Sequence, residues 1–137
     1  MIVVLDTNVV ISALLFGGRT GPFRELWTKH AIKPIANREM LHEYARVLAY
    51  KKFKLDAEEI SLLLEEEVFA YFTIVRTSSR KLPSVPKDHT DTIFLRAGID
   101  GHAAFLVTGD AHLQALDGAY PFPIVTPGRF LENHPGL

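Results

Sequence analysis

The stretch Ile2-Val3-Val4-Leu5-Asp6-Thr7-Asn8 decides how the rest of this sequence is interpreted. Four apolar residues, three of them β-branched, are typical of a short strand that is buried on both faces of a parallel sheet. Asp6 follows at once and marks the carboxyl end of that strand. In open α/β sheets this end borders the crevice that binds ligands, so we predict that Asp6 faces a functional crevice. The alternative is that Asp6 and Asn8 only cap the helix that follows.

A similar arrangement occurs near the other end of the chain. The apolar run 103–107 predicts a second buried strand, and Thr108-Gly109-Asp110 follows it directly. Because the carboxyl ends of parallel strands lie at the same edge of a sheet, we expect Asp6 and Asp110 to meet in one crevice. Asp110 could also be a simple helix cap, but the repetition favours a functional interpretation of both acids.

Strands and helices alternate along the whole sequence. Pro34 argues that its strand lies at an edge of the sheet or that the residue stands at the strand start. The pattern predicts an α/β fold with three layers, α/β/α, and a central parallel sheet of four or five strands. We expect a single domain of this kind over residues 1–137. We expect strands at 2–5, 32–36, 72–75, 103–107 and 122–125, and helices at 9–16, 22–29, 38–50, 56–69, 91–101, 110–116 and from 127 onward.

Composition excludes several classes of protein. The 137 residues carry a net charge of −1, so the sequence has no global electrostatic sign of nucleic-acid binding. It has no cysteine, which excludes disulfides, thiolate zinc sites and cysteine nucleophiles. We find no signal peptide and no apolar run long enough to span a membrane, and we therefore expect a cytoplasmic protein.

Two predicted helices contribute further acids to the same edge of the sheet. Glu43 lies in the helix at 38–50, and Asp91 begins the helix at 91–101, with Asp88 three residues earlier. Carboxylates crowded together repel one another unless a cation lies between them. Oxygen ligands without cysteine suit Mg²⁺ or Mn²⁺, and such an ion can activate water and stabilise the leaving oxygen of a phosphodiester. These residues therefore predict phosphoester hydrolysis.

Each of these residues also has a simpler interpretation. Glu43 could be one more exposed acid of an amphipathic helix, and Asp88 and Asp91 could both be helix caps. His89 lies beside the acids and is a possible substrate contact, although a solvated loop histidine is the simpler assignment. We assign no role to the other histidines, which lack metal-ligand spacing: His30, His42, His102, His112 and His134.

Five segments together resemble the PIN-domain family, of the kind that includes the VapC-like ribonuclease toxins of toxin–antitoxin pairs. They match that family in order and spacing over essentially the whole chain. The segments are Val4-Leu5-Asp6-Thr7-Asn8-Val9, Glu43-Tyr44-Ala45-Arg46-Val47-Leu48, Asp88-His89-Thr90-Asp91-Thr92-Ile93-Phe94-Leu95, Leu106-Val107-Thr108-Gly109-Asp110 and Ile124-Val125-Thr126-Pro127.

The resemblance implies an endoribonuclease in which a metal-activated water cleaves RNA. It implies that Asp6, Glu43, Asp91 and Asp110 are catalytic and hold one or two Mg²⁺ or Mn²⁺ ions, with Asp88 as a further ligand. It implies that Asn8 and Thr108 orient the carboxylates or water. It also implies a homodimer or higher oligomer and an antitoxin that inserts a basic side chain into the acidic crevice.

The sequence departs from the family pattern around the third acid. His89 stands where relatives often have proline, and Thr92 where they have an amide or acid, which leaves open a weakened metal site. Arg96 and Gly98 replace apolar residues or alanine. The alternative hypothesis is therefore a catalytically weak or silent PIN-like module that binds RNA or protein.

Basic residues outside the acidic segments are the candidates for contact with RNA phosphates. Their alternative is scattered surface charge. These residues are Arg19, Arg24, Lys51, Lys52, Lys54, Arg76, Arg80, Lys81 and Lys87.

Overall fold

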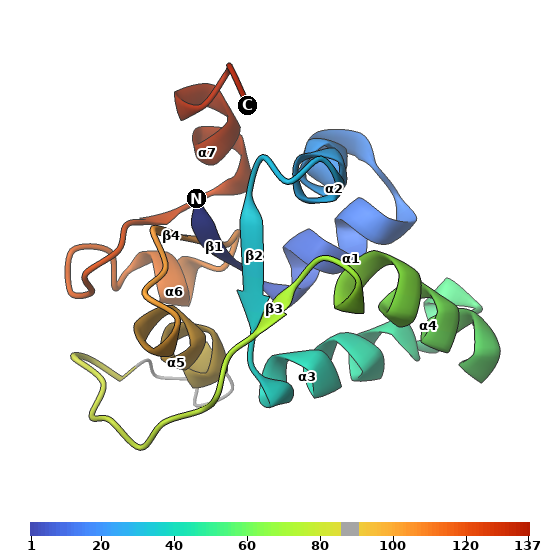
Figure 1. Cartoon of the computed structure of the whole chain (residues 1–137), viewed down its shortest axis with the longest axis horizontal. Coiled ribbons are helices and arrows are strands. Elements are labelled where there is room, and N and C mark those ends of the chain that lie inside the picture. The colour runs from blue at the N-terminus through green and yellow to red at the C-terminus, as the bar shows by residue number, and fades with distance from the viewer. Residues whose placement is uncertain (86–90) are drawn as a thin grey trace.

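The computed structural model, which describes residues 1–85 and 91–137, contains a parallel sheet with the strand order β3-β2-β1-β4-β5 (Figure 1). This arrangement confirms the predicted α/β fold. Within the described residues the sheet has five strands, the larger of the two numbers expected from the sequence. The strands are β1 (Ile2–Leu5), β2 (Lys33–Ala36), β3 (Thr73–Ile74), β4 (Phe105–Val107) and β5 (Ile124–Val125).

The first predicted strand, β1, is the centre of the sheet. Val4 pairs with Ile35 of β2 on one side and with Leu106 of β4 on the other. Val3, Val4 and Leu5 have no exposed surface, because both faces of the strand are covered. This burial explains why the strand consists of an unbroken apolar run instead of alternating apolar and polar residues.

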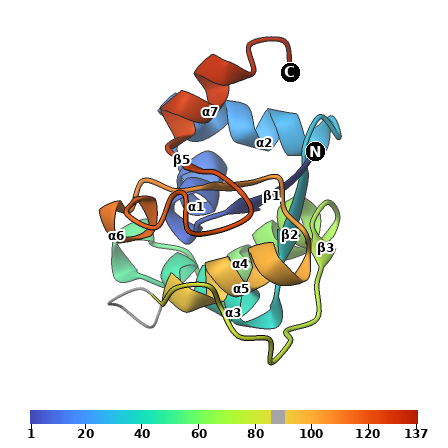
Figure 2. The same ribbon diagram turned by 90° about the vertical axis from the view of Figure 1, so that its left-hand side faces the viewer.

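Helices cover both faces of the sheet, as expected for three layers. Figure 2 shows the strands between α2 and α7 on one side and α3 and α5 on the other. Short helical turns occur at η1 (Gly18–Thr20), η2 (Lys51–Phe53) and η3 (Leu64–Phe69). The α-helices are α1 (Thr7–Leu15), α2 (Gly21–Thr28), α3 (Arg38–Leu48), α4 (Ala57–Leu63), α5 (Thr92–Asp100), α6 (Ala111–Gln114) and α7 (Pro127–Asn133).

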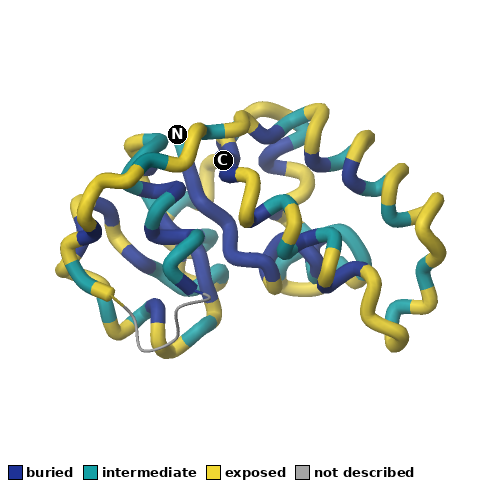
Figure 3. The backbone as a smooth tube through the Cα atoms, turned by 90° about the horizontal axis from the view of Figure 1, so that it is seen from below, coloured by how far each residue is buried: buried dark blue, intermediate teal, exposed yellow. Residues whose placement is uncertain are grey.

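The core lies in the middle of the molecule and thins toward α4. Figure 3 shows buried backbone running through the centre, whereas α4 contains no buried residue. The helix predicted at 56–69 is divided in the structure, because α4 ends at Leu63 and continues as the wider turn η3. Within the described ranges, no helix has both the length and the hydropathy needed to cross a membrane.

Pro34 illustrates one correction to the predicted topology. β2 lies between β3 and β1, so the suggestion of an edge strand is wrong. The position at the strand start is right, because β3 pairs with β2 only from Ile35 onward. The missing N–H of Pro34 therefore removes no hydrogen bond to β3.

Gly98, which departs from the family pattern, has a packing reason. A Cβ atom at this position of α5 would lie 2.6 Å from Cζ of Phe122, a buried residue just before β5. The glycine lets the ring approach the helix backbone. Arg96 on the same helix donates a hydrogen bond to the carbonyl of Arg80 and ties the preceding loop to α5.

Candidate functional site

The carboxyl ends of the strands border a cavity of about 220 Å³, here called the acidic cavity. The four predicted acids approach it from four places: the ends of β1 and β4, the middle of α3 and the start of α5. The structure therefore brings together Asp6, Glu43, Asp91 and Asp110, although their catalytic role stays a prediction. The lining consists of Asp6, Thr7, Asn8, Glu43, Val47, Tyr50, Asp91, Phe94 and Asp110.

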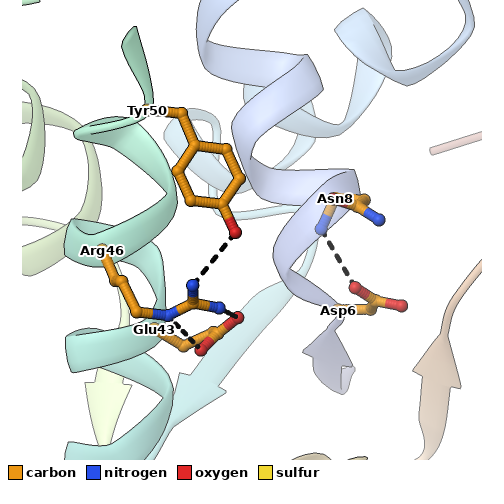
Figure 4. A network of polar contacts seen from close by, with 5 residues as sticks. All are labelled: Asp6, Asn8, Glu43, Arg46 and Tyr50. Atoms are coloured by element: carbon orange, nitrogen blue, oxygen red, sulfur yellow. Dashed lines mark hydrogen bonds and ion pairs between the residues drawn. The ribbon is translucent and has the colours of Figure 1, made fainter.

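Asp6 is both a helix cap and a wall of the acidic cavity. One carboxylate oxygen accepts a hydrogen bond from the backbone N–H of Asn8 at 3.0 Å, which caps α1 (Figure 4). The backbone N–H of Asp6 donates to the carbonyl of Val107 at 3.1 Å, so the residue is still held by β4. The two interpretations of Asp6 are therefore compatible, because the cap fixes a carboxylate that also faces the cavity.

Thr108 links the two strand-end acids through one buried hydroxyl. It donates a hydrogen bond to the second carboxylate oxygen of Asp6 and accepts one from the backbone N–H of Asp110 at 3.0 Å. The hydroxyl therefore holds Asp6 in place, whereas the predicted role of Thr108 in catalysis stays a prediction. Asn8, by contrast, holds Asp6 through its backbone N–H, and its side chain is exposed at the rim.

The surroundings of Asp6 make its carboxylate a group that gains from a cation. Burial raises the pKa of Asp6 above its ordinary value, and the negative charges of Asp110 and Glu43 raise this pKa further. The hydrogen bonds from Thr108 and Asn8 lower the pKa but do not cancel the effect of burial. A positive ion in the cavity would offset both the burial and the repulsion.

Asp110 caps α6 and forms a second group with Asp91. Its carboxylate accepts a hydrogen bond from the backbone N–H of His112 at 2.7 Å. Asp91, Asp110 and His112 each place one potential metal ligand within 4.8 Å of the others. The sequence analysis assigns no role to His112, because no second histidine stands at ligand spacing. Its position in the first helical turn after Asp110 is the signal that could have indicated a place near the acids.

Glu43 is not a free surface acid, because it lines the cavity and binds Arg46. The guanidinium of Arg46 donates two hydrogen bonds to its carboxylate, at 2.6 and 3.2 Å, and a third to the Tyr50 hydroxyl at 3.0 Å. In Figure 4 these three residues lie on or just after α3 and face Asp6 and Asn8. The sequence did not predict this cation next to the acids.

Buried polar contacts set the positions of the helices that bear the acids. The Tyr44 hydroxyl donates to the carbonyl of Leu5 at 2.9 Å, which holds α3 against the end of β1. Burial raises the pKa of Tyr44 well above its usual value, so the hydroxyl stays a donor. The Asn37 side chain caps α3 and donates to the carbonyl of Ile93 at 2.9 Å, which joins α3 to α5.

The remaining candidates lie elsewhere. Asp88, His89 and Lys87 fall outside the described residues. Arg24 forms an ion pair with Glu67 and is not among the residues that line the acidic cavity. Lys52 lines a neighbouring cavity. The other described candidates are exposed at the surface: Arg19, Lys51, Lys54, Arg76, Arg80 and Lys81.

The residues of the acidic cavity fit a hard divalent cation. Carboxylate oxygens are the ligands that Mg²⁺ and Mn²⁺ prefer. Within residues 1–85 and 91–137, the buried hydroxyls of Thr7 and Thr92 have no hydrogen-bond partner, and Thr7 lines the cavity. A buried hydroxyl without a partner costs free energy, which a hydrated ion would relieve.

Comparisons with known proteins show the fold and the family of this chain. Among solved structures, the chain is similar to one described as "Crystal structure of VapBC2 from Rickettsia felis bound to a DNA fragment from their promoter". The TM-score is 0.63 and the sequence identity is 17%, over 92% of this chain and 98% of that chain. At this identity the likeness shows the fold. None of the curated proteins matches the sequence. A family model described as "PIN domain" matches residues 2–112. Because this match spans most of the sequence and includes the four acids of the cavity, the chain belongs to the PIN-domain family.

Proposed function

We propose that this protein is a metal-dependent endoribonuclease and the toxin of a toxin–antitoxin pair. The observation that supports this most is the convergence of four carboxylates on one cavity of about 220 Å³. Four carboxylates line this cavity, whereas its described lining contains no lysine or arginine; Arg46 pairs with Glu43 from outside that lining. Such a surplus of negative charge suits a bound cation better than a structural ion-pair network.

Asp6, Glu43, Asp91 and Asp110 would hold Mg²⁺ or Mn²⁺, with Asp88 as a further proposed ligand. The ion would supply Lewis acidity and lower the pKa of water for phosphodiester hydrolysis. The chain supplies the fixed geometry: Thr108 and the N–H of Asn8 hold both oxygens of Asp6. These two hydrogen bonds preorganise Asp6, whereas Glu43 would have to release Arg46 before its carboxylate could bind the ion.

The partners are proposed from the family and from the similar solved structure. That structure is of VapBC2, bound to a DNA fragment from their promoter. We propose for this chain an antitoxin that covers the acidic cavity, self-association into a dimer or higher oligomer, and a cytoplasmic location. The acidic cavity would attract a basic side chain by the same charge that attracts a metal ion.

The test is incubation of the purified protein with single-stranded RNA in EDTA, Mg²⁺ or Mn²⁺. We expect cleavage with either metal, none in EDTA, and none with the Asp6→Asn variant, which keeps a side chain of the same shape. Glu58→Gln is a matched control, because this exposed acid on α4 lies outside the cavity and should leave cleavage unchanged. Full activity of Asp6→Asn would contradict the proposal.

A second candidate function is a catalytically silent module that binds RNA or protein. The pairing of Glu43 with Arg46 favours it, because both carboxylate oxygens of a proposed ligand already accept hydrogen bonds. Melting curves separate the two candidates, since an ion that binds the folded state raises the melting temperature by mass action. A melting temperature unchanged by millimolar Mn²⁺ would favour the silent module.

A further inference from the structure

A second cavity, of about 290 Å³, adjoins the acidic cavity and differs from it in chemistry. Asn8, Val47 and Tyr50 line both, so the two cavities are adjacent. The second cavity lies between α1 and η2, and its distal wall consists of aromatic rings. We call it the aromatic groove, defined by Phe16, Tyr50 and Phe53.

The rings of the aromatic groove are available to a ligand. Phe16 is 67% exposed and Tyr50 is 40% exposed, so both rings present surface that a ligand can cover. Phe53 lies between them, with ring centroids 5.7 Å from Phe16 and 6.4 Å from Tyr50. The rings of Tyr50 and Phe53 are nearly parallel, with an interplanar angle of 5°, so they present faces of similar orientation.

Positive charges surround these rings although the whole chain has a net charge of −1. Lys52 Nζ lies 5.1 Å from the centre of the Phe53 ring. Arg46 Cζ lies 5.6 Å from that of Tyr50, and the same guanidinium also pairs with Glu43. Lys51 and Lys54 are exposed on the same short connection. Proteins that bind single-stranded nucleic acids combine aromatic faces, on which bases stack, with cations that follow the phosphates.

We propose that the aromatic groove binds unpaired nucleobases of a single-stranded RNA whose neighbouring phosphate lies at the acidic cavity. This inference rests on the proposed nuclease function and adds to it a separate contact surface for the bases of the substrate. An RNA strand bound at the cavity reaches the groove directly, because the two share a wall. The three lysines beside the groove, Lys51, Lys52 and Lys54, attract the many phosphates of RNA. A second copy of the chain has a net charge of only −1 and would be attracted much less, so RNA is the favoured occupant.

The experiment measures fluorescence anisotropy of a labelled single-stranded RNA in EDTA, so that no metal-dependent cleavage occurs. An abasic ribose-phosphate oligomer of the same length is the probe without bases. We expect Phe16→Ala and Phe53→Ala to weaken RNA binding about 5- to 150-fold, the range for loss of one base–aromatic stack. Both variants should bind the abasic oligomer as the wild type does, because the cations remain.

Two further variants control for nonspecific effects. Phe69→Ala removes another exposed phenylalanine, 49% exposed on η3 and outside both cavities, and should leave RNA binding unchanged. Phe16→Trp keeps an aromatic face and should retain binding. Melting curves of each variant verify folding, and Phe16 decides the test if Phe53→Ala is unstable, because Phe16 is the more exposed of the two.

The inference would be overturned if Phe16→Ala bound RNA as tightly as the wild type. It would also be overturned if the wild type bound the abasic oligomer as tightly as RNA. Analytical ultracentrifugation tests the other occupant: dissociation of an oligomer in Phe16→Ala with RNA binding intact would assign the groove to a second copy. The proposed function fails separately. If the protein binds RNA through its bases but does not cleave it in Mn²⁺, the nuclease function is refuted and the base-binding groove is retained. If it cleaves RNA but Phe16→Ala does not weaken binding, the groove is refuted and the nuclease function is retained.

Discussion

Replacing Thr108 by valine tests whether one hydroxyl holds the two strand-end acids in place. Thr108 has no exposed surface, and its hydroxyl bonds both the Asp6 carboxylate and the Asp110 backbone N–H. Valine preserves the shape of the side chain and its burial. It removes both hydrogen bonds, so a buried carboxylate oxygen and a partly buried N–H lose their partner.

The expected loss follows from the types of the two hydrogen bonds. A bond to a charged group contributes about 1.5–3 kcal/mol and a neutral one about 0.5–1.5 kcal/mol. Water in the acidic cavity can replace part of both, because Asp6 and Asp110 line it. We therefore expect Thr108→Val to lower the free energy of unfolding by about 2–3 kcal/mol, a large part of the roughly 5–15 kcal/mol typical of a domain.

Urea denaturation in EDTA measures this change, with the slope checked for a constant two-state transition. Thr108→Ser is the matched control: it keeps the hydroxyl and removes one methyl group, at a cost of roughly 0.5–1.5 kcal/mol by analogy with other buried methyl deletions. The reasoning is refuted if Thr108→Val lies within about 0.5 kcal/mol of the wild type, or if serine destabilises as much as valine.

Two other predictions concern packing and charge away from the acids. Gly98→Ala should destabilise the protein by about 1–3 kcal/mol, because its Cβ would meet Phe122 at 2.6 Å and this overpacking exceeds the helix propensity gained. A double-mutant cycle with Phe122→Leu should show favourable coupling, and strictly additive changes would contradict the packing argument. Glu67→Gln should cost about 0.2–1 kcal/mol at pH 7, because Arg24 lowers the pKa of Glu67 below its ordinary 4.5. That contribution is present above pH 4.5 and is lost as the pH falls through the folded-state pKa, so melting curves of the two proteins should converge in acid; a constant difference would exclude the ion pair as its cause.

The sequence alone was enough to predict the strand ends and the edge at which acids gather. Apolar runs that stop abruptly at Asp6 and Thr108 require only local pattern, and the shared edge follows from the geometry of parallel strands. The alternation of elements likewise predicted the layers, since each amphipathic segment must bury its apolar face. The suggestion that Pro34 lies on an edge strand is wrong, because β3 covers the edge of β2 but is too short to reach Pro34. The sequence around Pro34 does not specify the length of β3.

Only the tertiary structure decided which side chains meet across elements. The hydroxyl of Thr108 bonds Asp6 across 102 positions of sequence, and the hydroxyl of Tyr44 bonds the carbonyl of Leu5 across 39. The clustering of His112 with Asp91 and the approach of Phe122 to Gly98 depend on how helices pack on the sheet. Periodicity determines which face of an element is buried, but contacts between distant elements depend on their crossing angles and distances, which no local pattern specifies.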